Sequence, residues 1–312
     1  MVTNKEKNFI SAVVYVHNNE NLVDAFCNSL HSVLDNNFEK FEIIFVNDGC
    51  TDNSIKKIKD FASKNKNAVI SIINMSIYQG IELAMNAGVD LAIGDFVFEF
   101  DSIAVDYEEQ KIMEVYYHSL KGHDIVSASP KNSVYITSKI FYAIFNRFSS
   151  AKYSLRTERF RILSRRAINR VQSLSKTISY RKAAYANSGL SIDCLFYKST
   201  LKGKSFDKKN FQTRKETAFD TLIMFTDIAY KITMLLTTML LIFTLLAGVY
   251  TLFIFIGDKK PIEGWTTTMI LLSGGFSGVF LILAIIIKYL SILVELVLKK
   301  QKYLMESIEK LS

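Results

Sequence analysis

Two long uncharged segments near the C-terminal end constrain the fold of this chain more than any other feature. The first, from Ile232 to Gly257, has no charged residue in 26 positions, and the second runs from Trp265 to Ile287. About 20 apolar residues cross a bilayer as a helix, and helices of soluble cores are rarely uncharged for so long. Because only seven residues connect the segments, we expect a transmembrane hairpin over 232–257 and 265–287 rather than two buried core helices.

Lys and Arg residues around the two segments predict their orientation. Both flanks are basic, whereas the connecting loop carries Lys259 and Lys260 alone. Since positive charge accumulates on the cytoplasmic side, we expect both termini in the cytoplasm, at a bacterial inner membrane. The basic residues of the flanks are Lys208, Lys209, Arg214, Lys215 and Lys231 before the first segment and Lys288, Lys299, Lys300 and Lys302 after the second.

The rest of the chain divides around this hairpin. We expect a folded domain over residues 1–225 and a membrane region over 226–312 that ends in a cytoplasmic helix, which returns along the membrane surface or packs on a second copy of the chain. The first 20 residues contain no apolar core, so no cleaved signal peptide is expected. A net charge of +8 suits an anionic membrane surface, and no nucleic-acid motif accompanies it.

The first hundred residues alternate between short apolar runs and helical patterns. Apolar, β-rich runs occur near 10–16, 41–46, 68–75 and 95–100, and each of the first three precedes a helical pattern. Such alternation predicts an α/β fold with a mostly parallel sheet and helices on both faces. Ligands of such sheets bind beyond the C-terminal ends of the strands.

Polar residues gather where these apolar runs end. Asn, Asp and Glu are ordinary turn formers, so each cluster alone has a structural explanation. Three clusters that converge on one end of a sheet favour a nucleotide-binding crevice instead. The candidate residues are Asn18 and Glu20 after the first run, Asn47 and Asp48 after the second, and Asp101 and Asp106 after the fourth.

Several longer motifs accompany these clusters. They are E-I-I-F-V-N-D-G-C-T-D-N-S at 42–54, A-M-N-A-G-V-D-L-A-I-G-D at 84–95, F-D at 100–101, R-F-R-I-L-S-R-R-A at 159–167 and G-K-S-F at 203–206. Together they resemble the family 2 glycosyltransferases of the GT-A fold, and in particular the polyprenyl-phosphate glycosyltransferases, which join such a domain to a C-terminal transmembrane pair. The resemblance implies transfer of a hexose from a nucleotide-sugar, UDP-linked by preference, to polyprenyl phosphate on the cytoplasmic leaflet, for cell-envelope glycan synthesis or modification.

The resemblance also implies roles for individual residues. Asp48 would contact the nucleotide together with Asn18, Glu20, Asn47 and Gly80. Asp101 would be the first acid of an Asp-x-Asp pair that binds Mg²⁺ or Mn²⁺, because such ions prefer carboxylate oxygens and offset the charge of a departing diphosphate. Asp106 is a second candidate ligand of the ion, although an acid at this position also suits the cap of the following helix.

Arginines follow the fourth apolar run at unusual density. Arg binds phosphate groups through two parallel hydrogen bonds, so the segment would receive the diphosphate or a lipid phosphate; a basic helix attracted to anionic lipid is the alternative. We expect Arg161 and Arg165 to act in catalysis with Asp101, and Arg156, Arg159 and Lys204 to bind the lipid phosphate.

Two departures from the family pattern keep a second function open. Ile103 occupies the position of the second Asp of the pair, and Arg159 occupies that of an expected acid. A catalytically inactive homologue that binds a partner at the membrane is therefore the alternative to an enzyme.

Overall fold

The computed structural model describes residues 5–131, 136–149, 153–174, 180–199 and 303–311, with isolated positions between 232 and 293. The chain forms two units, one of residues 1–217 with 300–312 and one of residues 218–299. The expected membrane segments, 232–257 and 265–287, lie outside the described residues except at those isolated positions. Within the described residues, no helix has the length and apolarity that crossing a bilayer requires.

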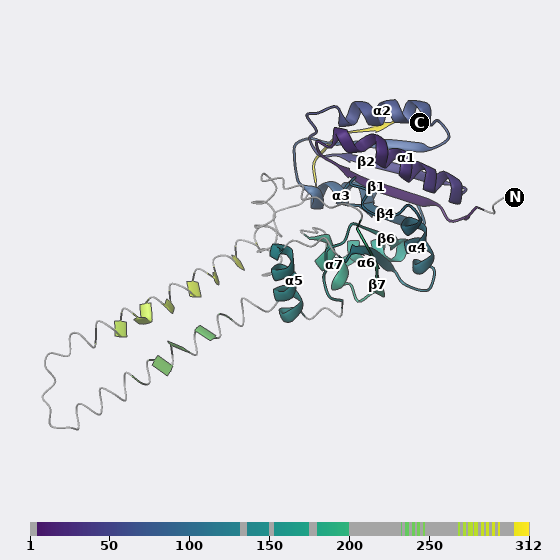
Figure 1. The fold of residues 1–312 in the computed structure, drawn as a ribbon. Coiled ribbons are helices and arrows are strands. Elements are labelled where there is room, and N and C mark those ends of the chain that lie inside the picture. The colour runs from purple at the N-terminus through teal and green to yellow at the C-terminus, as the bar shows by residue number, and fades with distance from the viewer. Residues whose placement is uncertain are drawn as a thin grey trace, which may run out of the picture. The chain divides into compact units, whose positions relative to one another are not determined.

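The first unit contains a twisted sheet flanked by helices (Figure 1). Its eight described strands lie in the order β7-β5-β6-β4-β1-β2-β3-β8. The strands are β1 (Ile10–Val16), β2 (Phe41–Asn47), β3 (Val69–Met75), β4 (Phe96–Phe100), β5 (Ile125–Pro130), β6 (Phe160–Ser164), β7 (Ile192–Tyr197) and β8 (Met305–Lys310). The pairs β1/β2, β1/β4, β2/β3 and β5/β7 are parallel, which confirms the predicted mostly parallel α/β sheet.

Helices cover both faces of this sheet. On one face α1, α2 and α4 bury side chains such as Phe26, Ile58 and Tyr116, and on the other α3, α6 and α7 bury Met85, Ile168 and Tyr185. Alternate residues of β1 serve the two cores, as the two-residue period of a strand requires. The helices are α1 (Glu20–Asn37), α2 (Ser54–Lys64), α3 (Ile81–Leu91), α4 (Gln110–Ser119), α5 (Ile136–Phe148), α6 (Arg165–Leu174) and α7 (Arg181–Ala186).

Two glycines of the motif at 84–95 have packing roles. A Cβ atom on Gly88 would lie 2.2 Å from Val13 Cγ1, so glycine lets α3 approach β1 closely. A Cβ atom on Gly94 would lie 2.6 Å from the backbone nitrogen of Ser11. The glycines of this motif therefore allow close packing against β1, and they have no direct chemical role.

The C-terminal end differs from the predicted helix. Residues Met305–Lys310 form β8, which pairs antiparallel with β3 at the edge of the sheet. The prediction of a C-terminal helix is wrong for these six residues. Most of their side chains are exposed, so the segment is held by main-chain pairing with β3 and by polar side-chain contacts from Asn74 and Lys59 rather than by an apolar face.

Candidate active site

Asp101 directly follows β4 at the carboxyl end of the sheet, where β1, β2 and β5 also end. Both of its carboxylate oxygens accept hydrogen bonds from arginines. Arg161 Nη2 donates to Oδ2 at 2.6 Å, and Arg181 Nη2 donates to Oδ1 at 2.7 Å. The Asp101 side chain remains 14% exposed, whereas both arginines are about 1% exposed. The structure thus offers one partly accessible carboxylate, fixed by two buried guanidinium groups.

Each arginine also binds further carboxylates. Arg161 lies opposite Glu99 in the β4/β6 register, donates to it through Nη1, and donates to Glu158 through Nε at 3.0 Å. Arg181 donates through Nε to Glu82 at 3.0 Å, and its Nη1 lies 2.9 Å from Glu99. We call Glu82, Glu99, Asp101, Glu158, Arg161 and Arg181 the Asp101 cluster.

The electrostatics of the Asp101 cluster keep its acid ionised. Burial alone would raise the pKa of Asp101, but the charges of Arg161 and Arg181 outweigh it and hold that pKa well below its ordinary value. The same acids raise the pKa of both arginines above the ordinary value, although burial acts in the opposite direction. Lys182 is a third cation that lowers the pKa of Asp101.

Asp48 is fully buried rather than facing an open crevice. Its carboxylate accepts hydrogen bonds from the backbone N–H groups of Gln79, at 2.8 Å, and Gly80, at 2.9 Å, and from the Tyr15 hydroxyl at 3.0 Å. Gly80 has a φ of 85°, which a side chain would disfavour. Asp48 and Gly80 therefore shape the loop before α3, and any contact with a nucleotide would be made by that loop.

The other polar residues of the first two strand ends bind one another. Asn18 accepts a hydrogen bond from the Thr51 N–H group at 2.8 Å, and Glu20 accepts one from the Asn53 N–H group at 3.0 Å. Asn47 donates to Asn74 at 2.8 Å. The structure thus places Asn18, Glu20, Asn47, Asp48 and Gly80 at the carboxyl end of the sheet, and their contact with a nucleotide stays a prediction.

The expected pairing of Asp106 with Asp101 is not what the structure shows. Asp106 is fully buried and accepts hydrogen bonds from Arg159 at 2.6 and 3.0 Å, Tyr197 at 2.8 Å and Ser199 at 2.9 Å. Its prediction as a metal ligand therefore conflicts with this geometry, since the carboxylate is fully buried and each of its oxygens already accepts two hydrogen bonds. The same ion pair draws Arg159 away from the solvent-facing position expected of a lipid-phosphate ligand.

Arg165 lies at the end of the sheet opposite Asp101. It donates to the backbone carbonyls of Ala92 and Gly94, at 3.0 and 3.1 Å, before β4 begins. The prediction that it acts beside Asp101 is wrong in this structure, because β6 runs antiparallel to β4 and carries the chain away from the site. Only the first part of the arginine-rich segment therefore belongs to the carboxyl end of the sheet.

Arg156 contributes to a separate basic pocket near that end. The pocket is open to solvent and has a volume of about 420 Å³; its lining is mainly apolar and includes three cationic side chains, Lys131, Lys139 and Arg156. Arg156 also lies over the Phe196 ring, 5.1 Å from its centre. The wall that contains Arg156 continues along the chain into Glu158 of the Asp101 cluster. Lys204, the third residue predicted to bind lipid phosphate, lies outside the described residues.

Helix α5 carries Phe141, Phe145 and Phe148 at helical spacing, and this aromatic stripe packs in part against the folded domain. Phe145 is fully buried, and the Phe141 ring lies 6.2 Å from that of Tyr180. Ile140 on the same helix is 56% exposed. Part of the aromatic stripe therefore belongs to the core of the domain, whereas Ile140 is exposed.

Arg181 and Glu82 were not among the sequence candidates. Arg181 belongs to the short helix α7 and lies 80 residues from Asp101 in the chain, so no local motif joins them. A weak signal was available, since Glu82 lies two residues after Gly80, in the first turn of α3. Polar residues at such helix starts lie near the carboxyl ends of the strands.

The family assignment follows from sequence comparison. Residues 11–183 match the family described as Glycosyl transferase family 2, which is more than half of the chain, and the chain belongs to this family. The mostly parallel sheet agrees with its GT-A fold.

Individual relatives are distant. An uncharacterized glycosyltransferase of Synechocystis is 27% identical over 72% of this chain and 71% of its own length. A bactoprenol glucosyl transferase of Shigella phage SfV is 26% identical over 60% of this chain, which spans 62% of that relative. Among solved structures, a mannosyltransferase of Pyrobaculum calidifontis in complex with GDP-mannose and Mn²⁺ has a TM-score of 0.50 at 12% identity, with 70% of this chain and 63% of that chain covered. This last similarity supports the fold alone.

The Asp101 cluster fits a divalent ion that arrives with a diphosphate better than one held by several protein acids. Ile103, at the position of the expected second Asp, is 2% exposed in the hydrophobic core, and Asp106 is engaged by Arg159. Each oxygen of Asp101 keeps one lone pair beyond its arginine contact. Mg²⁺ is often held by one or two carboxylates together with substrate phosphates.

Proposed function

We propose that this chain transfers a hexose from a nucleotide-sugar, UDP-linked by preference, to a polyprenyl phosphate at the cytoplasmic leaflet of a bacterial inner membrane. The proposal rests on one observation: Arg161 and Arg181 hold the carboxylate of Asp101 ionised at the carboxyl end of the sheet. Membership of glycosyltransferase family 2 and the similarity to a relative named bactoprenol glucosyl transferase support the reaction class and the acceptor.

On the donor side, the Asp101 cluster positions one carboxylate for the nucleotide-sugar. Arg161 and Arg181 fix both Asp101 oxygens, so little reorganisation is needed when the donor binds. A Mg²⁺ or Mn²⁺ ion bound at Asp101 would offset the charge that develops on the leaving diphosphate. Meanwhile the loop held by Asp48 would present its backbone to the nucleotide.

On the acceptor side, the basic pocket suits a lipid phosphate. Lys131, Lys139 and Arg156 supply positive charge, and Tyr142 and Phe196 in the same lining supply apolar surface for the first isoprene units. Because the phosphate is already ionised at neutral pH, its attack on the anomeric carbon needs no protein base. The loss of one acid at the Arg159 position is therefore compatible with catalysis.

The topology of the chain supports a membrane hairpin. The uncharged runs lie between residues 231 and 288, and the chain end after them pairs with the same sheet that precedes them through β8. A segment that leaves and re-enters one domain has both flanks on the same side of any membrane that it enters. Two spans satisfy this condition, whereas one span does not.

An inactive homologue that binds a partner is the second candidate. Two observations favour it, namely the buried Ile103 and the Arg159–Asp106 ion pair in place of an additional free acid. Asp101 and the basic pocket are present despite both features, so an inactive homologue is the less favoured of the two functions.

The test is a transfer assay with the full-length chain in detergent. Polyprenyl phosphate, Mn²⁺ and each of several UDP- and GDP-hexoses are supplied, and glycosylated lipid is resolved by mass. We expect product with at least one hexose donor, and less product when the ion is chelated. No product with any donor, from protein that binds nucleotide, would favour the inactive homologue. No nucleotide binding at all would reject the donor site itself.

A further inference from the structure

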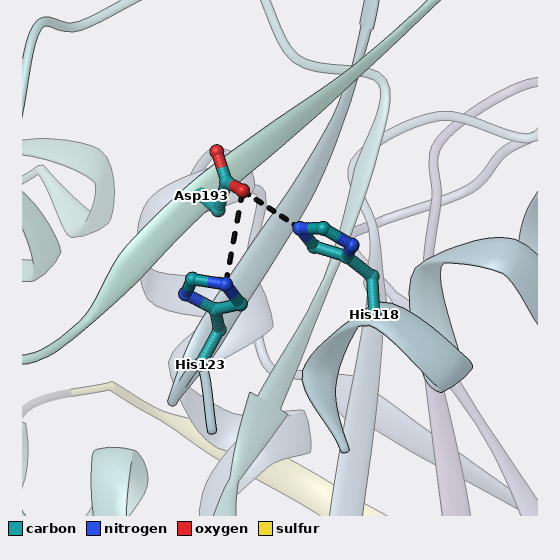
Figure 2. Close-up of side chains that lie close together, drawn as sticks. All are labelled: His118, His123 and Asp193. Carbon is teal, nitrogen blue, oxygen red and sulfur yellow. Dashed lines mark hydrogen bonds and ion pairs between the residues drawn. The ribbon is translucent and has the colours of Figure 1, made fainter. Parts of the chain in front are cut away.

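Two histidines and an aspartate meet at the end of the sheet opposite Asp101 (Figure 2). His118 lies in the last turn of α4, His123 in the connection to β5, and Asp193 on β7. His118 Nε2 donates to Asp193 Oδ2 at 2.7 Å, and His123 Nε2 lies 3.8 Å from the same oxygen. One potential ligand atom from each of the three residues lies within 4.8 Å of the others.

Neighbouring groups hold these side chains in place. The second ring nitrogen of His123, Nδ1, is hydrogen-bonded to the Ser191 hydroxyl at 3.0 Å, which leaves Nε2 directed at the carboxylate. Asp193 Oδ1 accepts a hydrogen bond from the Cys194 N–H group at 2.7 Å. The two imidazole rings stack with centres 4.9 Å apart and planes 9° apart. Partners of this kind orient the ligands of metal sites in proteins.

A hydrogen bond between His118 and Asp193 explains only part of this arrangement. It satisfies one histidine, yet His123 directs Nε2 at the same oxygen. Three potential ligand atoms, two imidazole nitrogens and one carboxylate oxygen, therefore converge on one position, and a single cation bound there would contact all three.

The distances suit a small transition metal ion. Zn²⁺ takes imidazole nitrogen and carboxylate oxygen at roughly 2.0–2.2 Å, so tetrahedral ligand atoms lie about 3.3 Å apart. The observed separations of 2.7 and 3.8 Å lie on either side of that value. We propose that His118, His123 and Asp193 bind one divalent ion of the zinc class, with solvent at the open position.

The site is chemically and spatially distinct from the Asp101 cluster. Two imidazoles and one carboxylate favour Zn²⁺ and its neighbours among the transition metals over Mg²⁺, which prefers oxygen ligands. The side chains are 21%, 29% and 46% exposed for His118, His123 and Asp193, so an ion can enter from solvent. By joining α4, the loop that follows it and β7, the ion would stabilise the half of the sheet that carries the basic pocket.

The experiment is a Zn²⁺ titration of the full-length chain in detergent, without an affinity histidine tag, against a chromophoric chelator. We expect one Zn²⁺ per chain, little competition from Mg²⁺, and a rise of about 5 °C or more in the unfolding midpoint at saturating Zn²⁺. Binding should weaken at least tenfold in His123→Ala and in Asp193→Ala, and about tenfold in Ser191→Ala.

Matched controls separate this site from others in the chain. His17→Ala removes a histidine outside the cluster, and Asp101→Asn removes the acid of the donor site, so both should retain the Zn²⁺ affinity of the unmodified chain. Unfolding midpoints measured with EDTA establish that each variant is folded, and His118→Gln replaces any variant that is not. Equal Zn²⁺ affinity in the unmodified chain and in a folded His123 or His118 variant would overturn the proposal, as would no binding at micromolar Zn²⁺.

Discussion

Replacement of Arg181 by methionine tests whether the Asp101 cluster is a single electrostatic unit. Arg181 is 1% exposed and contacts Glu82, Glu99 and Asp101 at 3.0, 2.9 and 2.7 Å. Methionine keeps part of the volume but leaves Glu99 and Asp101 with Arg161 alone and removes the guanidinium partner of Glu82. Removing one partner of a buried ion pair costs about 3–5 kcal/mol, which at 2–4 °C per kcal/mol lowers the unfolding midpoint by roughly 6–20 °C.

The effect of Arg181→Met should depend on pH. In the unmodified chain the arginines hold the pKa of Asp101 below its unfolded value, so the stability they provide is complete above about pH 4 and is lost as the pH falls further. Without Arg181, burial raises the pKa of Asp101 relative to the unmodified chain. The difference between the two unfolding midpoints should therefore be largest at neutral pH and narrow in acid.

The assay is thermal unfolding of the full-length chain in detergent between pH 3 and 7. Arg166→Met is the matched control, because Arg166 also pairs with an acid, Asp124, but its side chain is 73% exposed, so its removal should change the midpoint much less. A shift below about 2 °C for Arg181→Met, or a shift that is constant from pH 3 to 7, would refute the reasoning.

Three further predictions follow from the same geometry. Ile103→Asp, which restores the family's second acid, should destabilise the chain by about 3 kcal/mol or more without raising Mn²⁺ affinity, because the side chain enters the core; a gain in Mn²⁺ affinity measured by calorimetry would contradict this. Arg156→Ala should raise the KM for polyprenyl phosphate about tenfold and leave donor affinity unchanged, whereas Arg166→Ala, at the opposite end of the sheet, should change neither; equal effects of the two would argue against the basic pocket. Gln79→Ala removes two hydrogen bonds to Leu304, of 2.6 and 2.9 Å, so backbone hydrogen exchange in β8 should accelerate roughly tenfold or more, and unchanged exchange would show that β3 alone holds that strand.

The strands of the sheet could be predicted from the sequence because each one is marked by neighbouring residues in the chain. The apolar runs ending at Val16, Asn47 and Phe100 and the polar residues that follow them define the carboxyl end of the sheet. Strand direction is not local, and for that reason Arg165 was assigned to the wrong end. The antiparallel pairing of β6 with β4 separates it from Arg161 by the length of a strand.

The ion-pair partners of the buried charged residues could not be predicted from the sequence either. Asp106 meets Arg159 from 53 positions away, and Asp101 meets Arg181 from 80 positions away. Such pairs are set by how strands and helices pack, and no spacing rule encodes them. The same holds for His118, His123 and Asp193, which no short metal-binding spacing connects. The final strand was missed because its six residues, M-E-S-I-E-K, are too polar and too few to show a β pattern.

The central claim is that Asp101, fixed by Arg161 and Arg181, builds a nucleotide-sugar site. The most direct measurement is calorimetric binding of UDP- and GDP-hexoses, with Mn²⁺ present, to the unmodified chain and to Asp101→Asn, with Asp24→Asn as the surface control. We predict binding of at least one donor, weakened tenfold or more in Asp101→Asn and unchanged in Asp24→Asn. Equal affinity for that donor in folded Asp101→Asn, or no binding of any donor to the unmodified chain, would contradict the claim.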